Sequence, residues 1–226
     1  KTVAGQGVRL GGITQQFTQG SLQASERTLD LAVAGDGFFV VQGQPPRAVQ
    51  SYTRNGSFSV NVDREVVDTL GNKVQMLPVD SSTGTVTSTA QADLFDFVLP
   101  ETDPGDPTAT LANISVGDDG IVTATYSNGN QEYVGALALA SFAAVEGLRP
   151  AGDAHWQSTG ESGAALINQA GIGPLGLVRS GTLESANIDL TEQLVALIAA
   201  QRNFQANAQA IEKANAMTQT IVNLQG

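Results

Sequence analysis

The final stretch of the chain is the feature that most limits how it can fold. Between Gly181 and Gly226 it contains neither glycine nor proline, the two residues that most strongly oppose a helix interior. Apolar or small residues recur there in steps of four, three, seven, four and three, at Leu190, Leu194, Leu197, Phe204, Ala208 and Ile211. The step of seven passes over Gln201. This spacing predicts one helix over 190–224, ~52 Å long at 1.5 Å rise per residue.

The ends and faces of this helix indicate how it is used. Asp189 is placed as its N-cap, and Glu192 completes a capping box. A β domain of this size is a few tens of Å across, so the helix is expected to protrude and to need a partner. Further apolar residues lie off the first stripe, at Val195, Ile198, Met217, Ile221, Val222 and Leu224. Apolar groups on several faces favour packing among several helices, and a single docking face is the alternative.

The segment 29–142 has the pattern of short antiparallel strands. Residues 29–34 alternate, and 38–41 form a continuous apolar run that we expect to be buried. Four dipeptides are hairpin signals, because a type I′ turn needs positive φ at both central residues: Asn55-Gly56, Gly71-Asn72, Asp119-Gly120 and Asn128-Gly129. Loops are expected at 78–107, around a short strand at 94–99, and at 147–177. The predicted fold is mainly β with a long C-terminal α-helix, an antiparallel β domain plus a protruding assembly helix.

The net charge is concentrated in one stretch of the chain. The whole sequence carries −11, and residues 74–148 hold ten acidic residues with no lysine or arginine. We interpret this stretch as a solvated outer surface, with an acidic binding site as the alternative. The acidic balance excludes the basic surface typical of nucleic-acid-binding proteins. The absence of cysteine excludes disulfides and thiolate chemistry.

No motif in the sequence indicates a catalytic or cofactor site. Residues 171–176 match G-x-G-x-x-G, but the match contains Pro174 and precedes a strand-like segment, whereas a dinucleotide site needs a helix there. The one histidine, His155, has Ser158 and Ser162 nearby but no nucleophile elbow. Calcium-loop spacing is absent around the acidic residues Asp103, Asp106, Asp118 and Asp119. We predict no enzyme activity, no metal and no cofactor; a secreted acidic hydrolase using His155 is a remote alternative.

The start of the chain indicates a fragment or a processed product. It begins at Lys1 with no charged-then-apolar leader. No run approaches the length of about 18 apolar residues that a transmembrane helix needs.

Separated blocks of the sequence resemble the bacterial flagellar rod and hook proteins. The blocks are 16–22 with 29–39, 52–58 with 67–68 and Gly71, 181–190, and 201–208, with smaller matches at 126–129 and 140–142. The block 201–208, Gln-Arg-Asn-Phe-Gln-Ala-Asn-Ala, is most similar to the hook members. We expect only residues 78–107 to lie outside the resemblance.

This resemblance implies an axial structural protein, exported through the flagellar secretion channel, that polymerises into a helical tube. Members of the family have an inner layer of paired terminal helices and one or more outer β domains. For this chain the resemblance implies a linking segment at 1–28 after a missing N-terminal helix. A β-rich outer domain would follow at 29–184, with 78–107 as a short acidic insertion, and an inner-core helix at 185–226.

The resemblance also implies the assembly contacts. The expected interface residues are Leu190, Leu194, Leu197, Gln201, Arg202, Asn203, Phe204, Asn207, Ile211, Asn215 and Ile221. The apolar members would drive packing and the polar ones would fix register, because an unpaired buried amide costs ~1–3 kcal/mol. The expected partners are other copies of the chain, rod and hook–filament junction proteins, the export apparatus and the hook cap, with no nucleic acid and no membrane insertion.

We predict a hook subunit, and a distal rod subunit is the alternative that stays open. The block 201–208 favours a hook subunit, which would link rod to filament outside the cell and transmit torque. The short segment 78–107 cannot form the second outer domain common in hook proteins, and this favours a periplasmic distal rod subunit. At Asp63-Arg64-Glu65 the chain lacks the glycine turn usual in the family, so the resemblance does not predict that turn.

Overall fold

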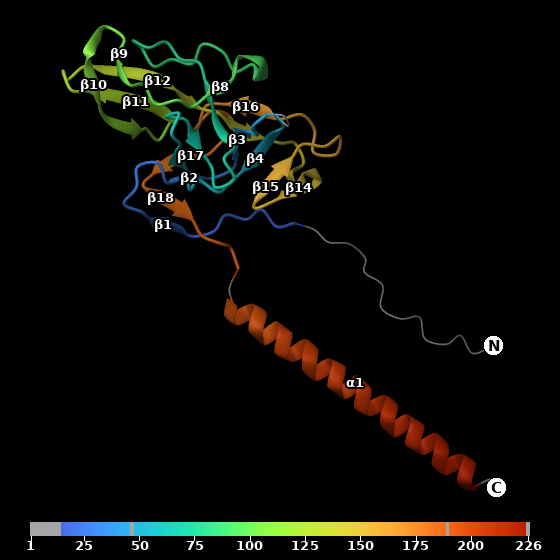
Figure 1. The fold of residues 1–226 in the computed structure, drawn as a ribbon. Helices are drawn as coiled ribbons and strands as arrows, with labels where there is room; N and C mark the ends of the chain where they lie inside the picture. The colour runs from blue at the N-terminus through green and yellow to red at the C-terminus, as the bar shows by residue number, and fades with distance from the viewer. Residues whose placement is uncertain (1–14, 46–47, 189, 225–226) are drawn as a thin grey trace. The chain divides into compact units, whose positions relative to one another are not determined.

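The computed structural model describes residues 15–45, 48–188 and 190–224. The chain divides into two units, 1–185 and 186–226; the first is rich in β-strands and the second is mainly one helix (Figure 1). The predicted mainly β fold with a long C-terminal α-helix is therefore confirmed. The predicted N-cap, Asp189, lies outside the described residues. Within the described ranges, no helix has the length and apolar character needed to cross a membrane.

The β unit is built on one large sheet whose strands pair antiparallel. Its order is β14 (Arg149–Gly152), β15 (His155–Gln157), β4 (Gln50–Thr53), β3 (Phe38–Gln42), β7 (Lys73–Leu77), β12 (Gln131–Leu137), β11 (Ile121–Tyr126), β10 (Asp106–Val116) and β9 (Thr102–Asp103). Shorter strands attach to this path: β5 (Ser59–Val60), β6 (Val66–Val67), β8 (Phe95–Asp96), β13 (Leu139–Ser141) and β16 (Leu166–Asn168). Figure 1 shows β9–β12 at one end of the unit and β14 and β15 at another.

Two separate ribbons join the beginning of the β unit to its end. In the first, β2 (Leu31–Ala34) pairs with β17 (Leu177–Ser180). In the second, β1 (Leu22–Ala24) pairs with β18 (Thr182–Glu184). Two 3-10 turns, η1 (Gln91–Asp93) and η2 (Val145–Gly147), lie in connections. The chain therefore enters and leaves the β unit through adjacent strands.

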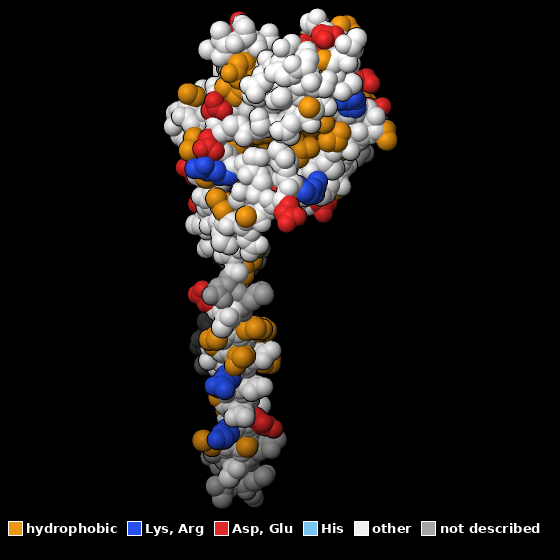
Figure 2. All heavy atoms as spheres, turned by 90° about the vertical axis from the view of Figure 1, so that its left-hand side faces the viewer, with side chains coloured by type: hydrophobic (Ala, Val, Ile, Leu, Met, Phe, Trp, Pro, Cys, Tyr) orange, Lys and Arg blue, Asp and Glu red, His pale blue; other side chains and the backbone are white. Residues whose placement is uncertain are grey.

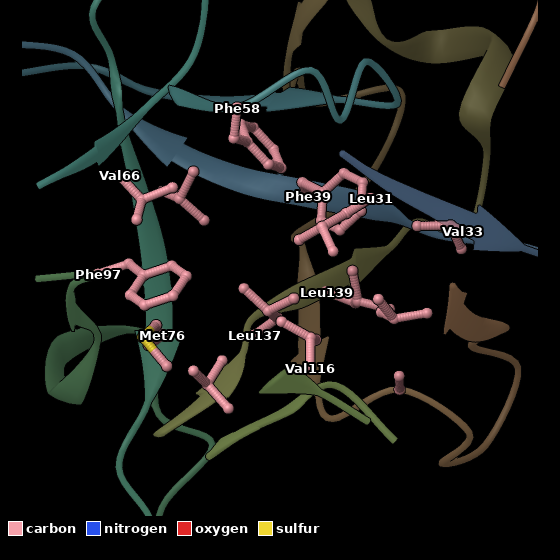
Figure 3. Packing of buried hydrophobic residues seen from close by; sticks show 14 of the residues in the cluster. Leu31, Val33, Phe39, Phe58, Val66, Met76, Phe97, Val116, Leu137 and Leu139 are labelled. Carbon is pink, nitrogen blue, oxygen red and sulfur yellow. The ribbon is translucent and has the colours of Figure 1, made fainter. Parts of the chain in front are cut away.

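The core explains why β3 is a continuous apolar run. Phe39 and Val41 belong to one buried cluster and Phe38 and Val40 to another, because successive side chains of a strand point to opposite faces. Figure 3 shows the first cluster, in which side chains from several strands converge, including Phe39, Phe58 and Leu137. The second cluster contains edge-to-face aromatic pairs. The ring centres of Phe38 and Trp156, for example, are 5.8 Å apart. The predicted burial of 38–41 is confirmed.

Three of the four predicted turn signals form hairpins, but not with the predicted turn type. At Asn128-Gly129 the amide of Tyr126 donates to Asn130 O (2.9 Å) and that of Gly129 to Tyr126 O (2.9 Å). Gly129 has φ 86°, while Asn128 is not among the residues with positive φ. This is a type I turn followed by a left-handed glycine and not a type I′ turn. The turns that end at Gly71 and Gly120 have the same pattern of backbone bonds.

The fourth signal, Asn55-Gly56, was wrong as a hairpin. Strand β4 pairs with β3 and β15, whereas β5 pairs with β6, so the two strands that flank the dipeptide do not pair with each other. Glycine is required at position 56 for another reason, the close approach of its backbone to the backbone of Leu31. The amide of Leu31 donates to Gly56 O (3.0 Å), and a Cβ at Gly56 would lie 1.6 Å from Leu31 O. No side chain fits there without moving the backbone.

The loop predictions were wrong where the short strands carry no regular apolar face. The expected short strand near 94–99 exists as β8. However, β9 and the start of β10 lie within 78–107, and β14, β15 and β16 lie within 147–177. Residues of β14 are all exposed, and β10 has few large apolar residues. Strands without a regular apolar face leave no periodic signal in the sequence.

The turn at Asp63-Arg64-Glu65 forms without a glycine. Arg64 has φ 65°, a conformation that costs a non-glycine residue about 1–2 kcal/mol. Its guanidinium donates to Leu99 O (3.2 Å) and Pro100 O (2.6 Å). These charge-assisted bonds offset the strain and attach the β5–β6 turn to the segment that follows β8.

The second unit contains the helix α1 (Leu190–Leu224), 35 residues long. Its bounds confirm the predicted helix over 190–224, and its length is ~52 Å. The helix forms where the helix-favouring residues Ala, Gln and Leu are frequent and glycine and proline are absent. In proteins most of the stability of a helix comes from the packing of its apolar face rather than from intrinsic propensity.

Candidate assembly surface

Helix α1 presents large apolar side chains to solvent. Seven are between 48% and 77% exposed: Leu194, Val195, Leu197, Ile198, Phe204, Ile211 and Met217. Figure 2 shows hydrophobic side chains along this helix with few charged ones among them. The helix carries only Glu192, Arg202, Glu212 and Lys213 as charged residues. A monomeric soluble helix would keep such a surface against a core, so this one has the character of a contact surface.

The helical repeat sorts these side chains into faces. Steps of three and four place Leu197, Gln201, Phe204, Ala208 and Ile211 along one stripe, because residues three and four apart are neighbours on a helix. Leu194 and Asn215 extend the stripe towards the two ends. Ile198 borders it, while Val195 and Met217 are turned away from it, so apolar side chains occupy more than one face.

The described members of the predicted interface all lie exposed on α1. They are Leu194, Leu197, Gln201, Arg202, Asn203, Phe204, Asn207, Ile211 and Asn215. Arg202 and Asn203 lie off the main stripe, whereas Asn207, three residues after Phe204 and four before Ile211, borders it. Leu190 and Ile221 belong to the helix, but their side chains lie outside what the structure describes. The role of this set in assembly remains a prediction.

The buried histidine has a structural partner. His155 in β15 is 3% exposed, its Nδ1 lies 2.8 Å from Asp153 O and its Nε2 lies 2.7 Å from Asp68 Oδ2. Both partners are acceptors, so both ring nitrogens donate and the ring is an imidazolium paired with a carboxylate. The hydrogen bond with the Asp68 carboxylate raises the pKa of His155, against the lowering effect of burial.

Asp68 receives several donors besides the histidine. Its Oδ1 accepts the backbone amides of Leu70 (2.8 Å) and Asn72 (2.9 Å), and its Oδ2 accepts the Asn72 side-chain amide (2.8 Å). Burial would raise the pKa of Asp68, but the hydrogen bonds from His155 and from these groups hold it below its usual value. The pair joins the β6–β7 turn to the β14–β15 hairpin and leaves no ring nitrogen for catalysis.

The other catalytic candidates are not brought together. The Ser162 hydroxyl donates to Thr159 O and Gly163 O, and no described hydrogen bond joins Ser158 or Ser162 to His155. Residues 171–176 form a turn with positive φ at Gly171 and Gly173, and a strand follows it. The motif is therefore a glycine-rich loop, since a dinucleotide site would need a helix after it.

The four acidic residues considered for calcium, Asp103, Asp106, Asp118 and Asp119, are bonded to the protein's own donors. The Asp103 carboxylate accepts Gly105 N (2.8 Å) and the side-chain amides of Asn128 (2.8 Å) and Asn130 (2.7 Å). These hydrogen bonds, those from Asn128 and Asn130 first, lower the pKa of Asp103. Asp118 pairs with Arg179 (2.8 Å). The part of the chain that the structure describes contains no group of three or more metal-ligating side chains.

Comparisons with known proteins place the chain among flagellar axial proteins. The profile described as "Flagellar hook protein FlgE/F/G D1 domain" matches residues 32–124, and "Flagellar basal body rod FlgEFG protein C-terminal" matches residues 179–224. The rod protein FlgG of Bacillus subtilis is 30% identical over 221 residues, which cover 97% of this chain and 74% of that protein. FlgG of Buchnera aphidicola is 32% identical over 96% of this chain and 73% of that protein. The chain belongs to the flagellar rod and hook protein family.

Within this family the hook proteins give a higher identity over a shorter match. The Escherichia coli hook protein FlgE is 44% identical over 121 residues, or 54% of this chain. That match covers 29% of the hook protein, so the aligned part of the chain spans less than a third of these relatives. The D1 profile also runs across 78–107, the segment that was expected to lie outside the resemblance; this expectation was wrong.

Sequence reasoning missed the buried polar contacts that hold the β unit together. Nothing in the local sequence connects Asp68 to His155, 87 positions apart, or Arg54 to Glu184, 130 positions apart. A buried charge needs a partner, but only the folded chain shows which one. The single histidine was the one signal in the sequence for this contact, and in the fold it makes hydrogen bonds with Asp153 and Asp68.

Proposed function

We propose that this chain is a structural subunit of the flagellar hook, which polymerises into a helical tube that links rod to filament and transmits torque. The observation that carries the proposal is helix α1, whose exposed apolar stripe belongs to a segment matched by the C-terminal profile of the family. Contacts between different surfaces of successive copies build an open helical assembly. The function is assembly, without catalysis or cofactor.

We propose two roles for the predicted interface residues on α1, packing for the apolar ones and register for the polar ones. Packing between copies would bury the exposed side chains of Leu194, Leu197, Phe204 and Ile211. Each Å² of apolar surface removed from water stabilises the assembly by ~25 cal/mol. Leu190 and Ile221 are proposed to do the same near the helix ends. The amides of Gln201, Asn203, Asn207 and Asn215, with Arg202, specify register, because an incorrect register would leave buried donors and acceptors unpaired.

The β unit is proposed to form the outer part of the tube. Of the ten acidic side chains in 74–148, only Asp103 is buried, which supports a solvent-facing role for this stretch. We propose the organisation stated above, with 1–28 as a linking segment, 29–184 as the outer domain and 185–226 as the inner-core helix. Polar contacts between outer domains would let neighbouring copies slide when a hook bends.

The proposed partners follow from this position. They are other copies of the chain, the rod and hook–filament junction proteins at the two ends of the tube, and the export apparatus and hook cap during assembly. The proposed location is the extracellular hook of the flagellum. The His155–Asp68 pair, with both ring nitrogens bonded within the protein, supports a non-enzymatic role.

A distal rod subunit is the second candidate. It is favoured by the rod relatives, which align with 94–97% of this chain, whereas the Escherichia coli hook protein aligns with 54%. The short connection at 78–107 points the same way. A subunit of this kind would lie in the periplasmic basal body.

Imaging a deletion strain distinguishes the two candidates. We expect electron microscopy of basal bodies from cells that lack the gene to show an intact rod without a hook, and an unmarked copy of the gene to restore the hook. Loss of the distal rod would establish the second candidate instead. Normal flagella in the deletion strain would overturn both.

A further inference from the structure

The ribbon β1/β18 is where the chain enters and leaves the β unit. Leu22 pairs with Glu184 and Ala24 with Thr182, and the chain passes from β18 into the second unit after Ser185. The β1 side chains are exposed and those of β18 are half-buried. No residue of either strand belongs to the apolar clusters of the described chain. Polar contacts therefore contribute much of what holds this ribbon to the rest of the β unit.

One buried ion pair supplies the strongest of these contacts. The Arg54 Nε donates to Glu184 Oε2 (3.0 Å), and the two side chains are only 13% and 11% exposed. The remaining Glu184 oxygen accepts the backbone amide of Gly20 (2.8 Å). A single carboxylate thus holds the segment before β1 and the end of β18 to one guanidinium.

Arg54 is itself fixed to the strands of the β unit. It directly follows β4, its Nη2 donates to Gly35 O (2.9 Å) and its Nη1 to Gly37 O (3.3 Å). The guanidinium carbon lies 5.9 Å from the centre of the Phe38 ring, within the range of a cation–π contact. The planar fork of arginine satisfies all of these partners at once, which lysine cannot do.

The other described ion pairs do not make this connection. Arg27 and Asp30 (3.5 Å) lie three residues apart in the segment after β1. Arg179 and Asp118 are 47% and 59% exposed, so solvent screens their attraction. Among the described residues, the Arg54–Glu184 pair alone joins a charge on the ribbon to a residue that follows a strand of the large sheet.

We propose that Arg54 and Glu184 are positioning residues that lock the β1/β18 ribbon onto the β unit and so fix the direction in which the chain leaves toward α1. The inference rests on the proposed axial function, in which each outer domain has to be held in a constant relation to the inner helix. The ribbon buries no core side chain, so loss of the pair releases it locally while the rest of the β unit stays folded.

Hydrogen exchange in the full chain tests this directly. In the Glu184→Gln variant, the amides of Gly20, Ser25, Thr182 and Ser185, all hydrogen-bonded in the ribbon or to its neighbours, should exchange at least ~10-fold faster. Arg54→Lys keeps the positive charge but loses the planar set of guanidinium donors, and it should increase these exchange rates by a smaller factor. The core amides of Val66 and Leu137 should be unchanged. Arg179→Gln, which breaks an exposed pair, is the matched control and should leave all of these rates unchanged.

The outcomes separate this inference from the proposed function. Unchanged ribbon exchange in both variants, or an equal acceleration at Val66 and Leu137, would overturn the lock. Normal swimming and normal hooks in Glu184→Gln cells would overturn its role in assembly, even with a loosened ribbon. A deletion strain with normal flagella would refute the proposed function, while the exchange measurements on the free chain would still report on the lock.

Discussion

Replacing Phe204 with aspartate is expected to abolish hook assembly and swimming. Phe204 is 77% exposed in the free chain, so the substitution removes little packing within it and adds a charge where water can solvate it. In the assembled tube the same position is proposed to be buried, where an unpaired carboxylate costs several kcal/mol per copy. The cost recurs at every subunit, and a polymer cannot tolerate it.

The measurement combines soft-agar motility with electron microscopy of basal bodies. Phe204→Leu is the matched control, because it keeps an apolar side chain in a helix, and it should restore assembly largely or fully. Trp156 is the only tryptophan and lies in the β unit, so its fluorescence shows whether that unit is folded in each purified variant. Normal hooks on Phe204→Asp cells would refute the packing role of the stripe.

Replacing His155 with alanine is expected to lower the free energy of unfolding of the β unit by about 3 kcal/mol, since it leaves the Asp68 carboxylate buried without its charged partner. The effect is placed at the low end of the range for broken buried pairs, because Leu70 and Asn72 still donate to Asp68. Urea unfolding followed by Trp156 fluorescence measures it. A change below ~0.5 kcal/mol would show that the pair contributes little.

The same pair predicts how stability depends on pH. The folded-state pKa of His155 is raised, so its contribution is complete below the unfolded value of about 6.5 and is lost as pH rises through the folded pKa. The folded-state pKa of Asp68 is lowered, so its contribution is present above about 3.9 and is lost as pH falls through the folded pKa. Stability from the pair should be greatest between these limits.

The control for this pH dependence is His155→Gln, which cannot titrate. The free energy of unfolding of the unmodified chain should fall between pH 6 and pH 9 by more than that of the variant. Parallel curves for the two proteins over this range would mean that folding does not raise the pKa of His155, in contradiction to its two acceptor partners.

Some parts of the fold could be predicted from sequence because their causes are local. Helix α1 matches its predicted bounds, since spacing, propensity and the absence of glycine and proline act over neighbouring residues. The run at 38–41 could be predicted to be buried, because a strand that is covered on both faces has apolar residues at every position. The turns that end at Gly71, Gly120 and Gly129 need a residue with positive φ, and glycine adopts this conformation without strain.

Other parts depended on residues far apart in the chain. Asn55-Gly56 has the local signature of a hairpin, but Gly56 is needed for the approach of Leu31, which the dipeptide cannot reveal. Strand β14 has no apolar alternation and exists through backbone pairing with β15. The contact of Arg54 with Glu184 joins segments 130 positions apart. For α1, the spacing of residues close together in the sequence was enough to predict its exposed apolar stripe.

In-cell photo-crosslinking from position 204 tests the central claim most directly. A benzophenone amino acid in place of Phe204 keeps an aromatic group on the stripe and reacts only with what lies against it. Irradiation of growing cells should give a ladder of covalent dimers and larger species of this chain in purified basal bodies, and Ser115, exposed on β10, offers a control position in the β unit. Monomer alone at position 204, or adducts with unrelated proteins only, would contradict assembly through α1.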